Sequence, residues 1–138
     1  MLERFKVPEK DRVYVPQDRI RAVTEAIFSH NGIAKEASIS STDVLIKNDL
    51  RGVESHGVSN GLRRYVAEYS AKSLNPKPDF KIIRESKTTM TVDADGALGI
   101  HVGPWAMQHA INKAKDYGMA AVAVTNSGHL AGCGYYAM

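Results

Sequence analysis

The sequence predicts an α/β fold that begins with a helical segment, and three observations support this. Apolar residues recur at helical spacing in three stretches between residues 17 and 70. After Pro78 the pattern becomes two short strand-like runs, one helical stretch and one continuous apolar run. Between these parts, residues 75–78 read Asn-Pro-Lys-Pro, and each proline pushes its predecessor into an extended conformation, as in a linker. We therefore expect two units, residues 1–75 and 76–138.

The first unit is expected to hold three helices. The first helix follows Pro16 and stops at Asn31-Gly32, two residues that tolerate the left-handed conformation. The second covers residues 34–49, although the poor helix formers of residues 38–42 leave a strand through residues 44–46 open. Ser55 is placed to cap the third, whose apolar stripe is Val58, Leu62, Tyr65, Val66 and Tyr69. Residues 1–15 carry mixed charges and suggest an arm that docks or stays loose.

The second unit is expected to mix strands with one helix. Residues 80–84 and 88–92 predict a hairpin around the polar turn at 85–87, and residues 93–96 have the chemistry of a further turn. Residues 104–117 predict a helix with Gly118 as its C-cap. Residues 119–124 form a small apolar run that is typical of a strand buried on both faces.

Bulk composition narrows the class of protein. Among 138 residues, 43% are hydrophobic and 24% charged, as in ordinary globular chains. The net charge of +3 is spread along the chain, so we expect no nucleic-acid partner. No apolar run reaches the roughly 18 residues of a membrane helix, and the N-terminus lacks the apolar core of a secretory signal. Cys133 is the only cysteine, which excludes an internal disulfide framework and favours a cytoplasmic location.

The stretch from Asp49 to Tyr65 concentrates polar groups at the mouth of the third predicted helix. If Ser55 caps that helix, His56 lies in its first turn, where the helix dipole resists an added proton; this suits proton exchange near neutral pH. Arg63 lies two helical turns further on, and a guanidinium is a natural clamp for a carboxylate. A 2-oxo or 2-hydroxy acid would need both groups. The alternative is a structural serine cap, a surface histidine and a solvent-exposed arginine.

A second candidate is the loop that carries His129 after the last predicted strand. Ligands often bind at the carboxyl ends of strands, and Gly128, Gly132 and Gly134 would let a ligand approach the backbone. These glycines do not form GxGxxG, so a Rossmann fingerprint is not supported. The alternative is a tight glycine turn with a polar histidine. We expect Cys133 and Trp105 to be packing residues, and the remaining histidines are too scattered to predict a metal site.

Three blocks carry a family resemblance: LRGVESHGVSNGLRRY, VDADGALGIHVGPWAM and AVTNSGHLAGCGYY. Together they resemble the malate/L-lactate dehydrogenase family of the second, non-Rossmann type, which is similar to ureidoglycolate, sulfolactate and diketogulonate dehydrogenases. The resemblance runs from about Pro16 onward. It implies an NAD- or NADP-dependent oxidoreductase that interconverts a small 2-oxo acid and its 2-hydroxy acid. It also implies that residues 76–138 begin a mixed-sheet, non-Rossmann nucleotide-binding domain, and that the protein is a homodimer.

The resemblance assigns roles to individual residues. His56 matches the family's proton donor or acceptor, and Ser55 is its neighbour in the site. His129 matches a second histidine near the nicotinamide and the substrate, and Gly132 lies in the same cofactor-binding loop. The family commonly places a substrate-binding arginine four residues after the first histidine. Here that position is Asn60, so the substrate-binding role falls to residues 63–65, which are Arg63, Arg64 and Tyr65.

Length sets a second expectation. Family members are far longer than 138 residues, so we expect an N-terminal portion of the enzyme that associates with itself or with the missing C-terminal portion. A competing hypothesis from another class is a catalytically inert fragment that acts only as an oligomerisation or binding module.

Overall fold

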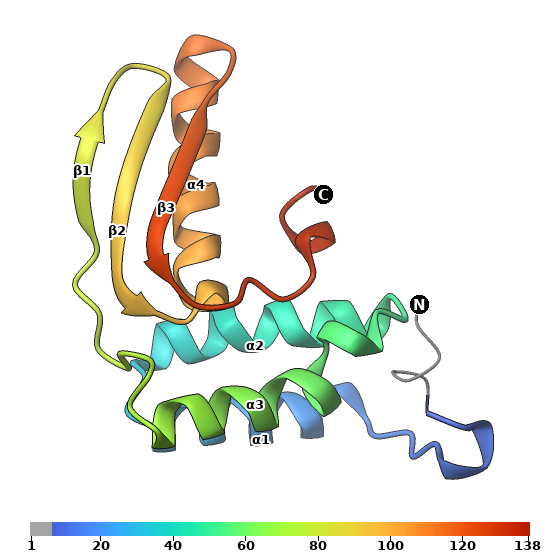
Figure 1. The fold of residues 1–138 in the computed structure, drawn as a ribbon. Coiled ribbons are helices and arrows are strands. Elements are labelled where there is room, and N and C mark those ends of the chain that lie inside the picture. Colours follow the sequence, from blue (N-terminus) through green and yellow to red (C-terminus); the bar gives the residue numbers. More distant parts are fainter. Residues whose placement is uncertain (1–6) are drawn as a thin grey trace.

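A computed structural model describes residues 7–138, so the first six residues of the expected arm lie outside the described part of the chain. Figure 1 shows a layer of three helices, α1 (Gln17–His30), α2 (Lys35–Leu50) and α3 (Val58–Ser70). Above this layer stand β1 (Lys81–Glu85), β2 (Thr89–Ala97) and β3 (Ala121–Ser127), with α4 (Gly99–Tyr117) on one face of the sheet. The predicted α/β class is confirmed.

Helix α2 is the central element of the helical layer, because it contacts α1 and α3 as well as α4. The alternative of a strand through residues 44–46 is wrong, since these residues are helical. Val44, Leu45 and Ile46 are nevertheless all buried, which a helix achieves only when neighbours cover it on several sides. The surrounding elements therefore override the weak local preference for a helix.

The start of α3 differs from the prediction. A short 3-10 turn, Glu54–His56, precedes the helix, and Gly57 rather than Ser55 is its N-cap residue. The Val58 N–H donates to the Asp49 carboxylate at 2.8 Å, so the cap comes from the end of α2. A Cβ at Gly57 would overlap that carboxylate. The glycine thus lets the two helix ends approach each other closely, and the Ser55 hydroxyl is left for another partner.

The sheet has the order β1-β2-β3 and mixed directions. Strands β1 and β2 form the predicted antiparallel hairpin, whereas β2 and β3 are parallel and joined through α4. The turn expected at residues 93–96 is instead an irregularity within β2, where Asp95 and Gly96 have φ of 52° and 73°. Helix α4 begins at Gly99, five residues before its expected start, and carries Pro104 in its second turn. Proline has no N–H to donate to the carbonyl four residues earlier, and that carbonyl, of Ile100, accepts the Ser41 hydroxyl at 3.3 Å instead.

Strand β3 is not buried on both faces, contrary to the prediction. Val122 and Val124 are half-buried, whereas Ala121, Ala123 and Thr125 are exposed. This alternation arises because successive side chains of a strand point to opposite faces, and α4 covers only one of them. Within residues 7–138 no helix covers the other face. A run of small apolar residues therefore fits a half-covered strand as well as a buried one.

One hydrophobic cluster links the helical layer to the lower end of the sheet. It contains Phe28, Leu45 and Tyr65 from the helices, together with Leu98 and Ala131 from beyond the proposed boundary at residues 75–76. A smaller cluster between sheet and α4 includes Trp105, the expected packing residue. None of the helices in the described residues is long and apolar enough to cross a membrane.

Candidate active site

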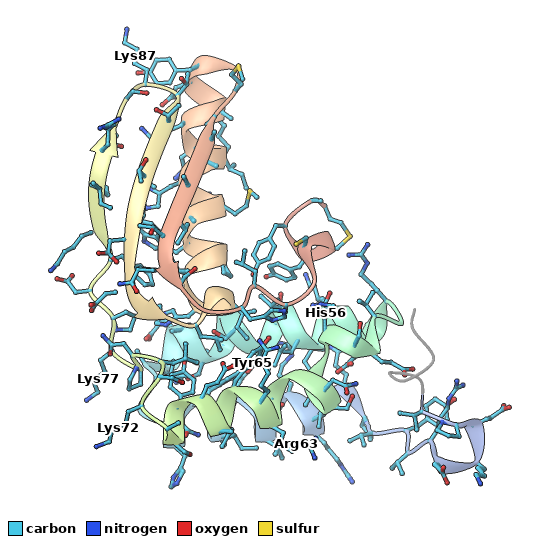
Figure 2. The ribbon with its side chains drawn as sticks, in the orientation of Figure 1. His56, Arg63, Tyr65, Lys72, Lys77 and Lys87 are labelled. Atoms are coloured by element: carbon cyan, nitrogen blue, oxygen red, sulfur yellow. The ribbon has the colours of Figure 1, made fainter. Side chains whose placement is uncertain are left out.

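Two histidines from distant parts of the chain meet above α2. His56 lies in the turn before α3 and His129 in the loop after β3, and their ring centroids are 5.5 Å apart with planes inclined by 15°. Figure 2 labels His56 beneath the C-terminal loop, with Tyr65 nearby on the same side of α3. Both imidazoles are half-buried. The fold thus brings together two imidazoles that are remote in the sequence.

His56 is held by its immediate neighbours. The Ser55 hydroxyl lies 2.8 Å from its Nδ1, and the side-chain amide of Asn48 donates to its backbone carbonyl at 3.2 Å. A hydroxyl can both donate and accept, so Ser55 is compatible with either neutral tautomer of His56 and with the protonated ring. His56 can therefore gain or lose a proton without losing this contact.

His129 is held differently, and its contacts fix its tautomer. The Ala131 N–H donates to Nδ1 at 3.1 Å, and the Tyr65 hydroxyl lies 2.9 Å from the same nitrogen. A backbone N–H can only donate, so Nδ1 must accept and the hydrogen of the neutral ring is on Nε2. Burial raises the pKa of Tyr65 to about 12, which keeps its hydroxyl protonated and able to donate. His129 is thus set as a hydrogen-bond donor through Nε2.

Electrostatics favour the neutral form of His129. Its pKa is lowered from the ordinary value of 6.5, first by partial burial and then by the charges of Arg64 and His56, while Glu68 opposes the shift. Desolvation and nearby positive charge both penalise the imidazolium. At neutral pH His129 therefore offers a hydrogen bond rather than a positive charge.

The structure brings Arg64, and not Arg63, to the imidazole pair. The Arg64 guanidinium carbon lies 5.2 Å from the centroid of the Tyr65 ring, and its Nε is 3.2 Å from the Glu68 carboxylate. Arg63 instead lines an apolar groove between α1 and α3, and Figure 2 shows it on the opposite side of α3 from His56. The prediction for Arg63 counts two helical turns from His56 in a helix capped by Ser55, whereas the cap is Gly57 and α3 starts two residues after His56.

Asn60, at the position where the family commonly has an arginine, stabilises the turn that carries His56. Its side-chain amide donates to the Glu54 carbonyl at 2.9 Å, and the residue is otherwise exposed. Asn60 is thus part of the support of the site in this chain.

The glycines of the His129 loop pack against the chain itself. A Cβ at Gly132 would lie 2.5 Å from Asn48 Oδ1, and one at Gly128 would lie 2.9 Å from Leu74. The N-terminus of α4 is also covered, because a Cβ at Gly99 would lie 2.5 Å from the Gly128 carbonyl oxygen. These close approaches leave no open glycine turn at a helix N-terminus, which is the usual cradle for dinucleotide phosphates.

Sequence reasoning missed Asn48 and Asp49 as parts of the site. Both lie near the end of α2, and the sequence analysis assigns a role to neither of them. The available signal was an asparagine on the apolar side of a predicted helix, since a buried amide needs hydrogen-bond partners. Cys133, expected to be packed, is exposed. Among the described residues, no three His, Cys, Asp or Glu side chains gather as metal ligands would.

Comparison with known proteins decides the family. The family model described as malate/L-lactate dehydrogenase matches residues 15–138. The chain belongs to the malate/L-lactate dehydrogenase family. It is 38% identical to a malate dehydrogenase of Pyrococcus horikoshii over 138 residues, which is 100% of this chain and 38% of that protein. It is 40% identical over 105 residues to an L-sulfolactate dehydrogenase of Methanocaldococcus jannaschii, covering 76% of this chain and 30% of that protein.

Solved structures of this dehydrogenase family have the same fold over the matched region. The Pyrococcus horikoshii malate dehydrogenase superposes with a TM-score of 0.90 at 39% identity, covering 99% of this chain and 39% of that one. The Methanocaldococcus jannaschii sulfolactate dehydrogenase gives a TM-score of 0.86 at 34% identity, covering 90% of this chain and 36% of that one. This member of the malate/L-lactate dehydrogenase family thus spans less than two fifths of the length of these relatives.

Proposed function

We propose that this chain supplies the proton-exchanging part of the active site of an NAD- or NADP-dependent dehydrogenase that interconverts a 2-oxo acid and a 2-hydroxy acid. The observation that carries the proposal is the stacked pair of His56 and His129, held in unlike hydrogen-bonding environments. Membership of the malate/L-lactate dehydrogenase family supports the reaction class. In the oxidising direction the 2-hydroxy acid loses a hydride from C2 and a proton from its oxygen.

The two imidazoles take different roles in this proposal. His56 exchanges the proton, because the Ser55 hydroxyl, which is its side-chain hydrogen-bond partner, accommodates every protonation state of the ring. His129 donates a hydrogen bond from Nε2 to the substrate oxygen, because Ala131 and Tyr65 occupy Nδ1 and keep it from taking a proton. His129 therefore orients the oxygen and polarises the carbonyl, while His56 gives or receives the proton.

The substrate carboxylate is assigned to Arg64. Its guanidinium is the one whose charge reaches His129, and at 49% exposed its side chain is free to turn toward a ligand. Its present ion pair with Glu68 is a surface pair between residues one helical turn apart, worth only a few tenths of a kcal/mol, or roughly 0.3–0.5. A bidentate contact with a carboxylate would compete well with it.

The nicotinamide cofactor would supply or accept the hydride at C2. The reacting end of such a cofactor suits the imidazole pair. Its phosphates do not suit Gly99, Gly128 and Gly132, because Asn48, Leu74 and the turn at residues 128–129 occupy the space beside these glycines. We therefore expect the phosphates of the dinucleotide to be held by a second protomer, in the homodimer that the family resemblance implies.

The decisive experiment is an assay of the purified 138-residue protein. It is incubated with NADH or NADPH and, in turn, pyruvate, oxaloacetate and a cyclic imino acid, and cofactor oxidation is followed by absorbance. We expect turnover with at least one 2-oxo acid and complete loss in His56→Ala, with the circular dichroism spectrum unchanged. Ser59→Ala, an exposed change in the first turn of α3, is the control and should retain activity.

The competing hypothesis makes the opposite prediction. A catalytically inert module would show neither turnover nor binding of NADH or NADPH under any of these conditions. Binding is measured separately by fluorescence of the reduced cofactor. If both measurements are negative for the wild-type chain, the proposed activity of these 138 residues is wrong.

A further inference from the structure

Asn48 connects the two loops that carry the histidines. It lies on α2 and is 1% exposed, so its amide is fully inside the protein. On one side the amide nitrogen donates to the His56 carbonyl at 3.2 Å. On the other side the amide is packed against Gly132, three residues after His129, closely enough that a Cβ there would lie 2.5 Å from Oδ1.

The backbone of Asn48 strengthens this connection. Its carbonyl accepts the N–H of Arg51 at 3.2 Å and of Val53 at 2.8 Å, which turns the chain from the end of α2 toward His56. The neighbouring carboxylate of Asp49 then caps α3 beyond His56. The turn bearing His56 is thus tied to α2 at both ends, and the same side chain that ties it also limits how closely the His129 loop can approach.

We propose that Asn48 is a positioning residue that sets the spacing of the two imidazoles by holding the His56 turn with a hydrogen bond and serving as the contact surface for the His129 loop at Gly132. The proposal rests on the proposed function only in calling the imidazole pair an active site. The spacing itself is a structural quantity and can be measured without turnover. Small displacements of catalytic groups are costly, so a residue that sets such a distance matters even though it touches no substrate.

This arrangement differs from an ordinary buried polar contact in one respect. A residue that only stabilises the fold would not carry a displacement of the His129 loop over to the turn that bears His56. Asn48 should do so, because an added methyl group at Gly132 would press on the end of its side-chain amide, and the amide is bonded to His56. A change in the His129 loop should therefore displace His56.

The test uses the intact 138-residue protein with 13C-labelled histidine and records the ring cross-peaks by NMR. Five histidines are present, so His56→Gln and His129→Gln variants assign the two peaks. Stacked aromatic rings shift each other's resonances, so the peak positions report ring spacing. Gly132→Ala is compared in the wild-type background and in Asn48→Ala, where the missing amide leaves room for the new methyl group.

We expect Gly132→Ala to shift the His56 peak in the wild-type background and to leave it unshifted in Asn48→Ala. Non-additivity of this kind is the signature of a direct coupling. Thr42→Val is the control, because Thr42 is equally buried on α2 and its hydroxyl has no hydrogen-bond partner among the described residues. It should leave both peaks in place. A shift confined to His129 in both backgrounds would overturn the proposal.

Asn48→Leu covers the case in which Asn48→Ala does not fold. It keeps a branched side chain of about the same size facing Gly132 and removes the amide donor that reaches His56. We expect the His56 peak to move, because a methyl group cannot donate a hydrogen bond to the carbonyl. An unchanged His56 peak in a folded Asn48→Leu protein would equally refute the positioning role.

Discussion

The hydroxyl of Tyr65 lies 2.9 Å from Nδ1 of His129, which ties the middle of α3 to the loop after β3. Tyr65 is 1% exposed and belongs to the main hydrophobic cluster, so its ring is fixed independently of the histidine. The hydrogen bond thus transfers the rigidity of the helical core to a side chain on a loop. Tyr65, expected to bind substrate, lies behind His129 in this arrangement and orients it.

Tyr65→Phe tests this relationship. The ring stays packed while one hydrogen bond is lost, which should lower the free energy of unfolding by about 1 kcal/mol. Because donors to Nδ1 favour the neutral ring, the pKa of His129 should rise toward its ordinary value, measured by NMR titration. Tyr69→Phe is the matched control, since the Tyr69 hydroxyl is buried without a partner among the described residues. If Tyr65→Phe and Tyr69→Phe changed the free energy of unfolding and the pKa of His129 equally, this would contradict the role of Tyr65 in orienting His129.

Arg64→Gln should raise the pKa of His129. The Arg64 charge lowers that pKa, and its removal also leaves the opposing charge of Glu68 without its ion-pair partner. Both changes stabilise the protonated form of His129, so both raise its pKa. Arg63→Gln removes the same charge from the far side of α3 and should leave the titration of His129 where it is. The reverse result would show that Arg63 is the arginine of the site.

The stability of the protein should depend on pH through His101. Its Nδ1 is buried and has no hydrogen-bond partner within residues 7–138, and burial lowers the pKa of His101 below 6.5. The unfolded chain therefore binds this proton more readily, and stability falls as pH drops below about 6.5, by at most about 1.4 kcal/mol per pH unit for one such group. His129, whose pKa is also lowered, acts in the same direction.

Urea denaturation between roughly pH 7.5 and 5.5 measures this dependence, because the carboxyl groups titrate mostly below that window. His101→Phe should flatten the curve, since the substitution removes one of the two groups and the new ring can pack against Phe80, now 5.3 Å from the imidazole. A His101→Phe protein that loses as much stability as wild type on acidification would show that this histidine does not contribute.

Gly57→Ala should be destabilising although its φ of −95° suits any residue. The added Cβ would overlap the Asp49 carboxylate that caps α3, and overpacking of this kind costs about 1–3 kcal/mol. Asp49→Ala alone should cost about 1 kcal/mol through loss of the cap. In the double variant the clash is gone, so the loss measured by denaturation should be smaller than the sum. If the double variant loses the sum of the two single losses in stability, the overlap at residue 57 is relieved by the movement of other atoms than the Asp49 carboxylate.

Much of the fold could be predicted from local patterns. The apolar stripes placed α1 and α2 to within a residue, and the polar turn at residues 85–87 located the hairpin. These features are set by residues close together in the sequence, where spacing alone says which side chains share a face. The three sequence blocks also indicated the family, and the family model that matches residues 15–138 confirms it.

The tertiary structure decided everything that depends on contacts between distant residues. Helix α3 starts later than the sequence predicts, because Asp49 provides its cap. With this start, Arg63 faces away from His56 and Arg64 lies on the side of the imidazoles. The exposure of β3 followed from α4 covering only one face of the sheet. The sequence by itself determined the helices and strands and the side chains that they carry. The packing of α2 against both loops decided which of those side chains meet. Contacts between residues that are distant in the sequence leave no periodic pattern along the chain, so the sequence did not reveal them.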